Sequence, residues 1–189
     1  MYRIQKRRRR VIDIIAALGM VVLSFVMIGG IAAVRDRVWG VYEQPVEDLP
    51  AIVSTVPVSI ENSPGEPIVA LSYCYNEAGT LVAYQVETKE MGYNPEVPIV
   101  IASTITADNR ALIGIEVLSQ KESEYYGARI AKKEFTDRFA GRYLPVYLTG
   151  TAGRGAHVDG IAGATASSKA VVAAIEDART FVEQYLMKD

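Results

Sequence analysis

Side chains that commonly hold metals or form cross-links are almost missing from this sequence. Its 189 residues include one cysteine, Cys74, and one histidine, His157. One cysteine excludes an intrachain disulfide, a cysteine-based metal site and an iron–sulfur cluster. One histidine excludes a histidine-rich zinc or haem site, so we expect no metal site. His157 can act as a general base, although a lone histidine in a glycine-rich loop is more often an exposed bystander.

The familiar motifs of nucleotide-binding enzymes are absent as well. The glycines at 153, 155 and 160 do not follow the dinucleotide fingerprint, and there is no Gly-Lys-Thr phosphate loop. Glu122 and Glu124 lie at strand-like spacing on one face, which suits acid–base catalysis, but a solvated strand edge is the commoner explanation. We expect no catalytic residues and no reaction catalysed by this chain alone.

Charge is distributed unevenly along the chain. The formal net charge is −2, yet residues 1–10 carry six basic side chains, which leaves the remainder at about −8. An acidic body of this kind argues against nucleic acid as a partner.

A long apolar run follows the basic cluster. Residues 14–34 contain no charged side chain, and at about 1.5 Å per residue they span roughly 31 Å, the thickness of a bilayer core. We predict a membrane-spanning helix over residues 11–34, with residues 1–10 in the cytoplasm and the rest of the chain extracytoplasmic. A cleaved signal peptide is the alternative, although the run exceeds the usual length of about 7–15 apolar residues.

The remaining chain changes between strand-like and helix-like patterns. Residues 35–67 are predicted to be a proline-rich linker with room for one short strand or helical turn. Two hairpins follow, and then a helix, a strand, a glycine-rich loop and a final amphipathic helix. This order predicts an α+β domain over residues 68–189, with an antiparallel sheet and packed helices. The expected elements are strands Ile68–Tyr75, Leu81–Thr88, Pro98–Thr106 and Ala111–Leu118, helix Gly127–Gly141, strand Tyr143–Leu148, and a helix from Lys169.

The most specific stretch of the chain is Asp159–Ser168. Its two glycines let the backbone bend and approach a ligand closely. Three hydroxyl side chains, those of Thr165, Ser167 and Ser168, crowd around the expected N-cap of the last helix. The free N–H groups at such a helix start favour an anion, above all a phosphate.

This stretch resembles a known motif. The pattern Asp159-x-x-Ala162-Gly163-Ala164-Thr165 is similar to the flavinylation motif of the FMN-binding domain family. The resemblance implies one FMN per chain, held by a phosphoester to the Thr165 hydroxyl and attached by a separate flavin transferase. It places Gly163, Ala164 and Ser168 beside the cofactor. Asp159 is expected to be recognised by the transferase, with a helix-start cap as its plainer role.

A second mark of that family lies upstream. Members carry Glu-Thr-Pro-Gly-Leu-Gly after a strand, and this chain has Glu122-Ser123-Glu124-Tyr125-Tyr126-Gly127. The resemblance implies that this segment contacts the flavin, where a tyrosine can stack on the ring; the residues expected there are Glu122, Ser123, Tyr125, Tyr126 and Gly127. Tyr93 and Tyr147 are further candidates, although a core role is commoner for any one of the eleven tyrosines.

The whole layout also resembles one kind of subunit. A single membrane helix, a linker and one FMN-binding domain are similar to the G subunits of Rnf-type ion-translocating electron-transport complexes, which are related to the C subunits of sodium-translocating NADH:quinone reductases. The resemblance implies a flavin electron carrier in the inner or plasma membrane. Its complex would couple ferredoxin/NAD electron transfer to Na⁺ or H⁺ translocation, with other integral and peripheral subunits as partners.

Two other functions remain open from the residues. One is a membrane-anchored flavin carrier that feeds an extracellular reductase outside any pump. The other is a non-redox binding module tethered to the membrane, in which the Gly-Ala-Thr turn is only a helix cap.

Overall fold

The computed structural model describes residues 44–60 and 67–187. The predicted cytoplasmic segment 1–10 and the predicted membrane helix 11–34 lie outside these residues. Within the described part, no helix is both long enough and apolar enough to cross a bilayer. The chain divides into two compact units, and all described residues belong to the second, Tyr42–Asp189.

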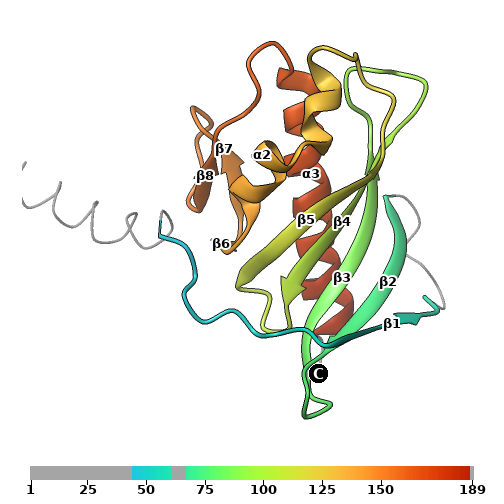
Figure 1. Cartoon of the computed structure of the whole chain (residues 1–189), viewed down its shortest axis with the longest axis vertical. Helices are drawn as coiled ribbons and strands as arrows, with labels where there is room; N and C mark the ends of the chain where they lie inside the picture. Colours follow the sequence, from blue (N-terminus) through green and yellow to red (C-terminus); the bar gives the residue numbers. More distant parts are fainter. Residues whose placement is uncertain (1–43, 61–66, 188–189) are drawn as a thin grey trace, which may run out of the picture. The chain divides into compact units, whose positions relative to one another are not determined.

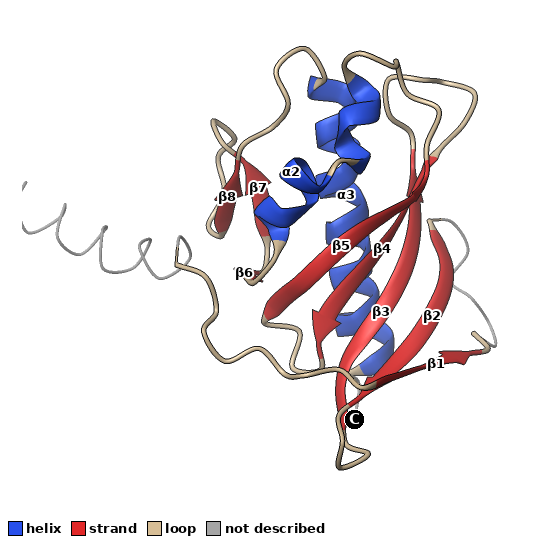
Figure 2. Ribbon diagram, viewed as in Figure 1, coloured by secondary structure: helices blue, strands red, loops and turns tan. Residues whose placement is uncertain are grey.

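An antiparallel sheet of six strands forms the body of this unit (Figures 1 and 2). The strands lie side by side in chain order, and both predicted hairpins are confirmed. Their bounds are β1 Ser54–Val58, β2 Ile68–Tyr75, β3 Leu81–Glu90, β4 Ile99–Thr106, β5 Ala111–Ser119 and β6 Arg142–Tyr143. The first strand falls in the segment predicted as a linker, so that segment supplies one edge of the sheet.

Local turn chemistry explains both hairpins. In the β2–β3 turn, the Asn76 side-chain oxygen accepts hydrogen bonds from the N–H groups of Ala78 and Thr80, at 3.0 and 2.9 Å. Gly79 follows with φ of +72°, a left-handed conformation that glycine adopts without a steric penalty. In the β4–β5 turn, Asn109 takes the left-handed position with φ of +57°, which asparagine tolerates better than most residues.

The long helix α3, Thr165–Phe181, covers one face of the sheet (Figure 2). The Thr88 hydroxyl of β3 donates a hydrogen bond to the Ala174 carbonyl of α3 over 3.1 Å. Between the two layers lies the apolar core, in which each fully buried large side chain contributes about 1.5–3 kcal/mol. Fully buried members include Ile99, Ile101, Ile105, Leu112, Val171 and Ile175.

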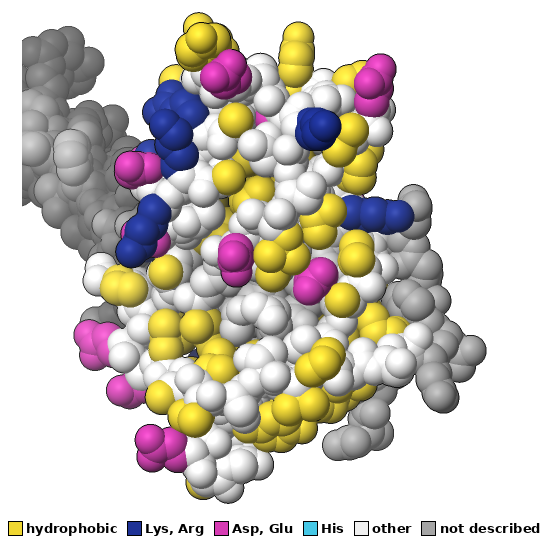
Figure 3. Space-filling view, turned by 45° about the vertical axis from the view of Figure 1, so that its right-hand side comes forward, with side chains coloured by type: hydrophobic (Ala, Val, Ile, Leu, Met, Phe, Trp, Pro, Cys, Tyr) yellow, Lys and Arg dark blue, Asp and Glu magenta, His cyan; other side chains and the backbone are white. Residues whose placement is uncertain are grey.

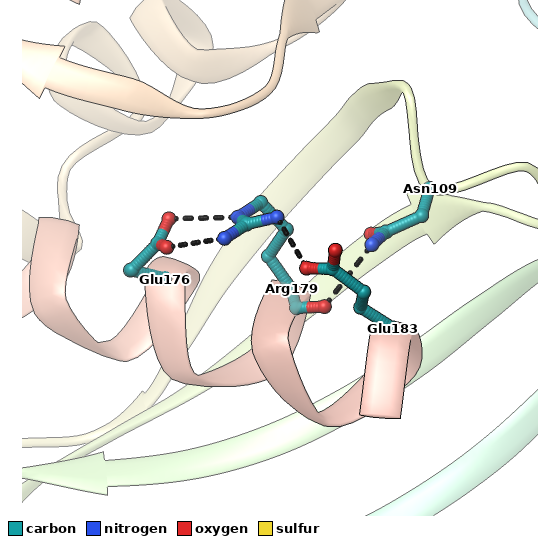
Figure 4. A network of polar contacts seen from close by, with 4 residues as sticks. All are labelled: Asn109, Glu176, Arg179 and Glu183. Carbon is teal, nitrogen blue, oxygen red and sulfur yellow. Dashed lines mark hydrogen bonds and ion pairs between the residues drawn. The ribbon is translucent and has the colours of Figure 1, made fainter. Parts of the chain in front are cut away.

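A polar network holds the end of α3 against the β4–β5 turn (Figure 4). The Arg179 guanidinium donates two hydrogen bonds to Glu176, at 2.9 and 2.6 Å, and one to Glu183 at 2.8 Å. Hydrogen bonding to the Glu176 carboxylate raises the pKa of Arg179. The Asn109 side-chain nitrogen donates to the Arg179 carbonyl over 3.1 Å. The helix then continues as a π-helical turn over Val182–Leu186.

The prediction of one helix over Gly127–Gly141 is wrong. The segment forms a 3-10 turn η1, Gly127–Ala131, a short helix α2, Lys133–Thr136, and a second 3-10 turn η2, Asp137–Phe139. Lys132 breaks the helix with an extended backbone, ψ +144°. The break lets Ile130 and Phe135 both reach the core, because two side chains five residues apart lie on different faces of a continuous helix.

The strand predicted over Tyr143–Leu148 is divided in two. Its first residue belongs to β6, and its last three residues form β7, Val146–Leu148, which pairs in parallel with β8, Ala156–Val158. Pro145 separates the two strands, because proline has no N–H to donate to a ladder. The glycine-rich loop between β7 and β8 is closely packed, since a Cβ on Gly153 would lie 2.5 Å from the ring of Tyr147.

Candidate cofactor site

The first turn of α3 presents unpaired backbone donors. The helix begins at Thr165, four residues before the predicted start, with Ala164 as its N-cap and no side-chain cap. Its first hydrogen bond runs from the Ser168 N–H to the Ala164 carbonyl over 2.9 Å. Among the described residues, the N–H groups of Thr165, Ala166 and Ser167 therefore have no acceptor. A helix start of this kind is a site for an anion.

None of the three hydroxyls predicted around the N-cap caps the helix. Ser168 is fully buried, and its Oγ accepts a hydrogen bond from the Ile161 N–H over 3.0 Å. It thereby fastens the loop before α3 to the helix. The Ser167 hydroxyl donates to the Glu122 carboxylate. The Thr165 side chain is exposed and has no hydrogen-bond partner within the described ranges, so it is the hydroxyl that a reagent can reach.

Glu122 is a buried carboxylate at the centre of the site. It is 8% exposed and accepts hydrogen bonds from the backbone N–H groups of Tyr93 and Asn94, both at 3.0 Å, besides the one from Ser167. Burying a carboxylate is costly unless its oxygens are hydrogen-bonded, and here three donors meet that need. Glu122 thus joins the loop after β3, the segment after β5 and the first turn of α3.

Two glycines make room for this carboxylate. A Cβ on Gly92 would lie 2.5 Å from Glu122 Oε1, and a Cβ on Gly127 would lie 2.7 Å from Glu122 Cβ and 2.8 Å from Ser167 Oγ. Larger residues at either position would push the carboxylate out. The match of Gly127 to the family segment therefore has a packing reason. Gly92 and Asn94 were not predicted, and their only sequence signal is the turn composition of Gly92-Tyr93-Asn94-Pro95.

A pocket of about 290 Å³ opens beside the helix start. Tyr93, Ser123, Tyr126 and residues 163–167 line it. The Tyr126 ring lies against Gly163, where a Cβ would come within 2.7 Å of the ring. Both tyrosines are largely exposed, 73% for Tyr93 and 55% for Tyr126, so their faces are accessible to an aromatic ligand. Exposed hydroxyl, free amide donors and aromatic side chains together fit the phosphate and ring of a flavin nucleotide.

Other predicted residues lie away from this pocket. Tyr125 is 80% exposed and is not part of the lining. Tyr147 lies in β7, with its ring centre 5.8 Å from that of His157. Asp159 is exposed and lines a different pocket, and its carbonyl accepts a hydrogen bond from Arg138 over 2.8 Å.

Ala164, by contrast, does line the pocket beside Thr165, although its side chain is buried.

The fold and the pocket together define an FMN-binding domain. The sequence model of the FMN-binding domain family matches residues 92–180, a range that holds both Glu122 and Thr165. The G subunit of the ion-translocating oxidoreductase complex of Methanosarcina acetivorans is 33% identical over 138 residues, which cover 72% of this chain and 71% of that protein. The chain belongs to this family, the G subunits of ion-translocating oxidoreductase complexes.

Solved structures agree on the fold. The crystal structure of the C subunit of the Na⁺-translocating NADH-quinone reductase from Parabacteroides distasonis superposes with a TM-score of 0.56 at 19% identity, covering 73% of this chain and 79% of that one. NqrC of Shewanella oneidensis gives a TM-score of 0.50 at 19% identity, with coverage of 63% and 61%. At this level of identity the likeness concerns the fold.

Proposed function

We propose that this chain is a covalent-FMN electron-carrier subunit of an Rnf-type membrane complex. The observation that carries the proposal is the exposed Thr165 hydroxyl at the uncapped start of α3, on the rim of a tyrosine-lined pocket. The FMN phosphate is esterified to Thr165 Oγ1 by a separate flavin transferase. The new bond joins this oxygen to phosphorus, and each chain gains one FMN with formal loss of one water.

The residues of the site then have distinct tasks. A phosphodiester keeps one negative charge, which the free amides and the dipole of α3 stabilise. Tyr93 and Tyr126 offer ring faces for the isoalloxazine. Glu122 holds the first turn of α3 in place through Ser167. When bound, FMN supplies electron transfer in single-electron steps. The covalent bond prevents loss of flavin from an extracytoplasmic domain, where free flavin would be dilute.

Membrane placement completes the proposal. Residues 11–34 cross the inner or plasma membrane once, residues 1–10 lie in the cytoplasm, and the FMN domain lies outside it. Other integral and peripheral subunits supply the ion pathway and the redox partners, and the complex couples ferredoxin/NAD electron transfer to Na⁺ or H⁺ translocation. The exposed Asp159 side chain, six residues before Thr165, is available to the flavin transferase. Copurification of integral subunits separates this function from that of a carrier working alone.

Intact-mass analysis of the protein from native membranes tests the attachment. We expect a gain of one FMN less one water on the wild-type chain and none on Thr165→Ala. Thr151→Ala is a matched control, because it also removes an exposed threonine hydroxyl but lies outside the pocket. Flavin that stays on Thr165→Ala through denaturation would overturn the assignment of Thr165.

A further inference from the structure

The buried carboxylate of Glu122 lies directly behind the wall of the cofactor pocket. Glu122 itself does not line that pocket, whereas Tyr93 and Ser167 do. Both of these residues bind its carboxylate: the Tyr93 N–H donates a hydrogen bond to it over 3.0 Å, and the Ser167 hydroxyl donates another. The thickness of a single residue therefore separates the Glu122 carboxylate from the pocket.

The hydrogen bonds of Glu122 hold its side chain in the charged form. Two of its three donors are the backbone N–H groups of Tyr93 and Asn94, which can donate a hydrogen bond but cannot accept one. A protonated carboxyl group fits these donors less well, because its O–H is itself a donor. The three donors are neutral groups, so they stabilise the negative charge without cancelling it. A full negative charge is thus fixed beside the pocket.

Burial distinguishes this charge from the exposed carboxylates of the domain. The chain beyond residue 10 is acidic overall, and on the face seen in Figure 3 acidic side chains are scattered over the surface. Water and salt screen the fields of such exposed groups, but they screen a buried charge much less. Glu122 is only 8% exposed, so its field extends into the adjoining pocket.

A negative charge at this place acts on the redox chemistry of the cofactor. Under the proposed function, the Tyr93 side chain offers its ring to the isoalloxazine, while the backbone N–H of the same residue binds the Glu122 carboxylate. Full reduction delivers two electrons from the redox donor and one proton from solvent, which leaves the flavin ring one charge more negative. A fixed negative charge nearby opposes this change.

We propose that the charge of the Glu122 carboxylate lowers the reduction potential of the FMN bound at Thr165. This role is additional to holding the first turn of α3, because it depends on the charge of the side chain and not only on its hydrogen bonds. The proposal rests on the proposed function, since it needs FMN in the pocket. With the carboxylate in place, the reduced cofactor is a stronger electron donor than it is in the same pocket without that charge.

Spectroelectrochemical titration of the flavinylated full chain tests the proposal. The protein is purified in detergent, dithionite supplies the electrons, and the flavin absorbance gives the midpoint potential. We expect Glu122→Gln to raise the midpoint by about 30 mV or more, which corresponds to a tenfold larger ratio of reduced to oxidised flavin for a two-electron couple. Glu124→Gln is the matched control and should leave the midpoint unchanged, because Glu124 is exposed and lies outside the pocket lining.

Two further variants separate the effect of charge from that of position. Glu122→Asp keeps the charge but shortens the side chain, so its midpoint should stay closer to that of the wild type than to that of Glu122→Gln. Ser167→Ala removes one neutral donor and leaves the carboxylate, so the less compensated charge should move the midpoint below that of the wild type. Ser167→Ala also provides a measurement if Glu122→Gln does not fold.

The results distinguish failure of this proposal from failure of the proposed function. An unchanged midpoint in Glu122→Gln, equal upward shifts in Glu122→Gln and Glu122→Asp, or an upward shift in Ser167→Ala would each overturn the effect of the charge. The titration reads only the flavin that is present, so a lower FMN content does not alter the midpoint. Intact mass on the same samples reports attachment at Thr165, and a wild-type chain without FMN would overturn the proposed function together with this inference.

Discussion

Replacing Glu122 by glutamine tests whether this carboxylate organises the cofactor site. The change keeps the size of the side chain and removes its charge. In the native site the two carboxylate oxygens accept from three donors, the Tyr93 and Asn94 N–H groups and the Ser167 hydroxyl. In Glu122→Gln the amide oxygen replaces one of the two carboxylate oxygens and can still accept hydrogen bonds. The amide NH₂ replaces the other oxygen, where it faces a backbone N–H that then has no acceptor.

The magnitude follows from this mismatch. One buried donor loses its acceptor, which costs about 1–3 kcal/mol. The remaining hydrogen bonds lose their charge assistance, which adds roughly 1 kcal/mol. We therefore expect Glu122→Gln to lower the free energy of unfolding by about 3 kcal/mol. Because the first turn of α3 depends on Ser167, we also expect a smaller fraction of chains to carry FMN at Thr165.

Urea unfolding of the full chain and intact-mass measurement of FMN content are the assays. Glu116→Gln is the matched control, since Glu116 is an exposed glutamate on β5, and it should change neither quantity. If Glu122→Gln were as stable and as fully flavinylated as the control, a positioning role for the carboxylate would be refuted.

Three further predictions concern single sites. Gly163→Ala places a side chain on a backbone with φ of +80° and against the Tyr126 ring. We therefore expect thermal unfolding to show a free energy of unfolding lower by about 1–2 kcal/mol, and intact mass to show less bound FMN. Gly114→Ala is the control and should be tolerated, because a Cβ at Gly114 would meet open space. Ser103→Ala should raise the free energy of unfolding, measured with urea, by about 1 kcal/mol, because the buried Ser103 Oγ has no hydrogen-bond partner within the described ranges. A lower free energy of unfolding in this variant would contradict the prediction. Burial and the neighbouring Asp177 raise the pKa of Glu90 from 4.5 to about 7. The folded state then holds a proton that the unfolded state has released, so stability falls between about pH 4.5 and 7; Glu90→Gln should flatten this decline, and an unchanged slope would contradict it.

Elements with local causes were predictable from the sequence. The two hairpins follow from turn residues such as Asn76 and Asn109, whose side chains or backbone preferences act within a few residues. The last helix was recognised from its periodicity, but its start was predicted four residues late. The serine hydroxyls expected around the N-cap bind other partners instead: Ser167 binds Glu122, and Ser168 binds the Ile161 N–H.

The break within residues 127–141 had no comparable local signal. No glycine or proline lies at Lys132 to indicate the break. The helix breaks there because the side chains of Ile130 and Phe135 are both buried in the core. A core position is set by elements far away in the chain, so periodicity within one segment does not reveal it.

By itself, the sequence determined the type of cofactor chemistry. The scarcity of cysteine and histidine excluded cysteine-based and histidine-rich metal centres, and the resemblance of the motif ending at Thr165 indicated a flavin phosphate at a helix start. Only the tertiary structure decided how the site is built. The contact between Ser167 and Glu122 joins residues 45 positions apart, and Gly92 and Gly127 gain their importance from the carboxylate between them. Such contacts arise from the packing of α3 on the sheet, which depends on the whole core rather than on any one stretch of residues.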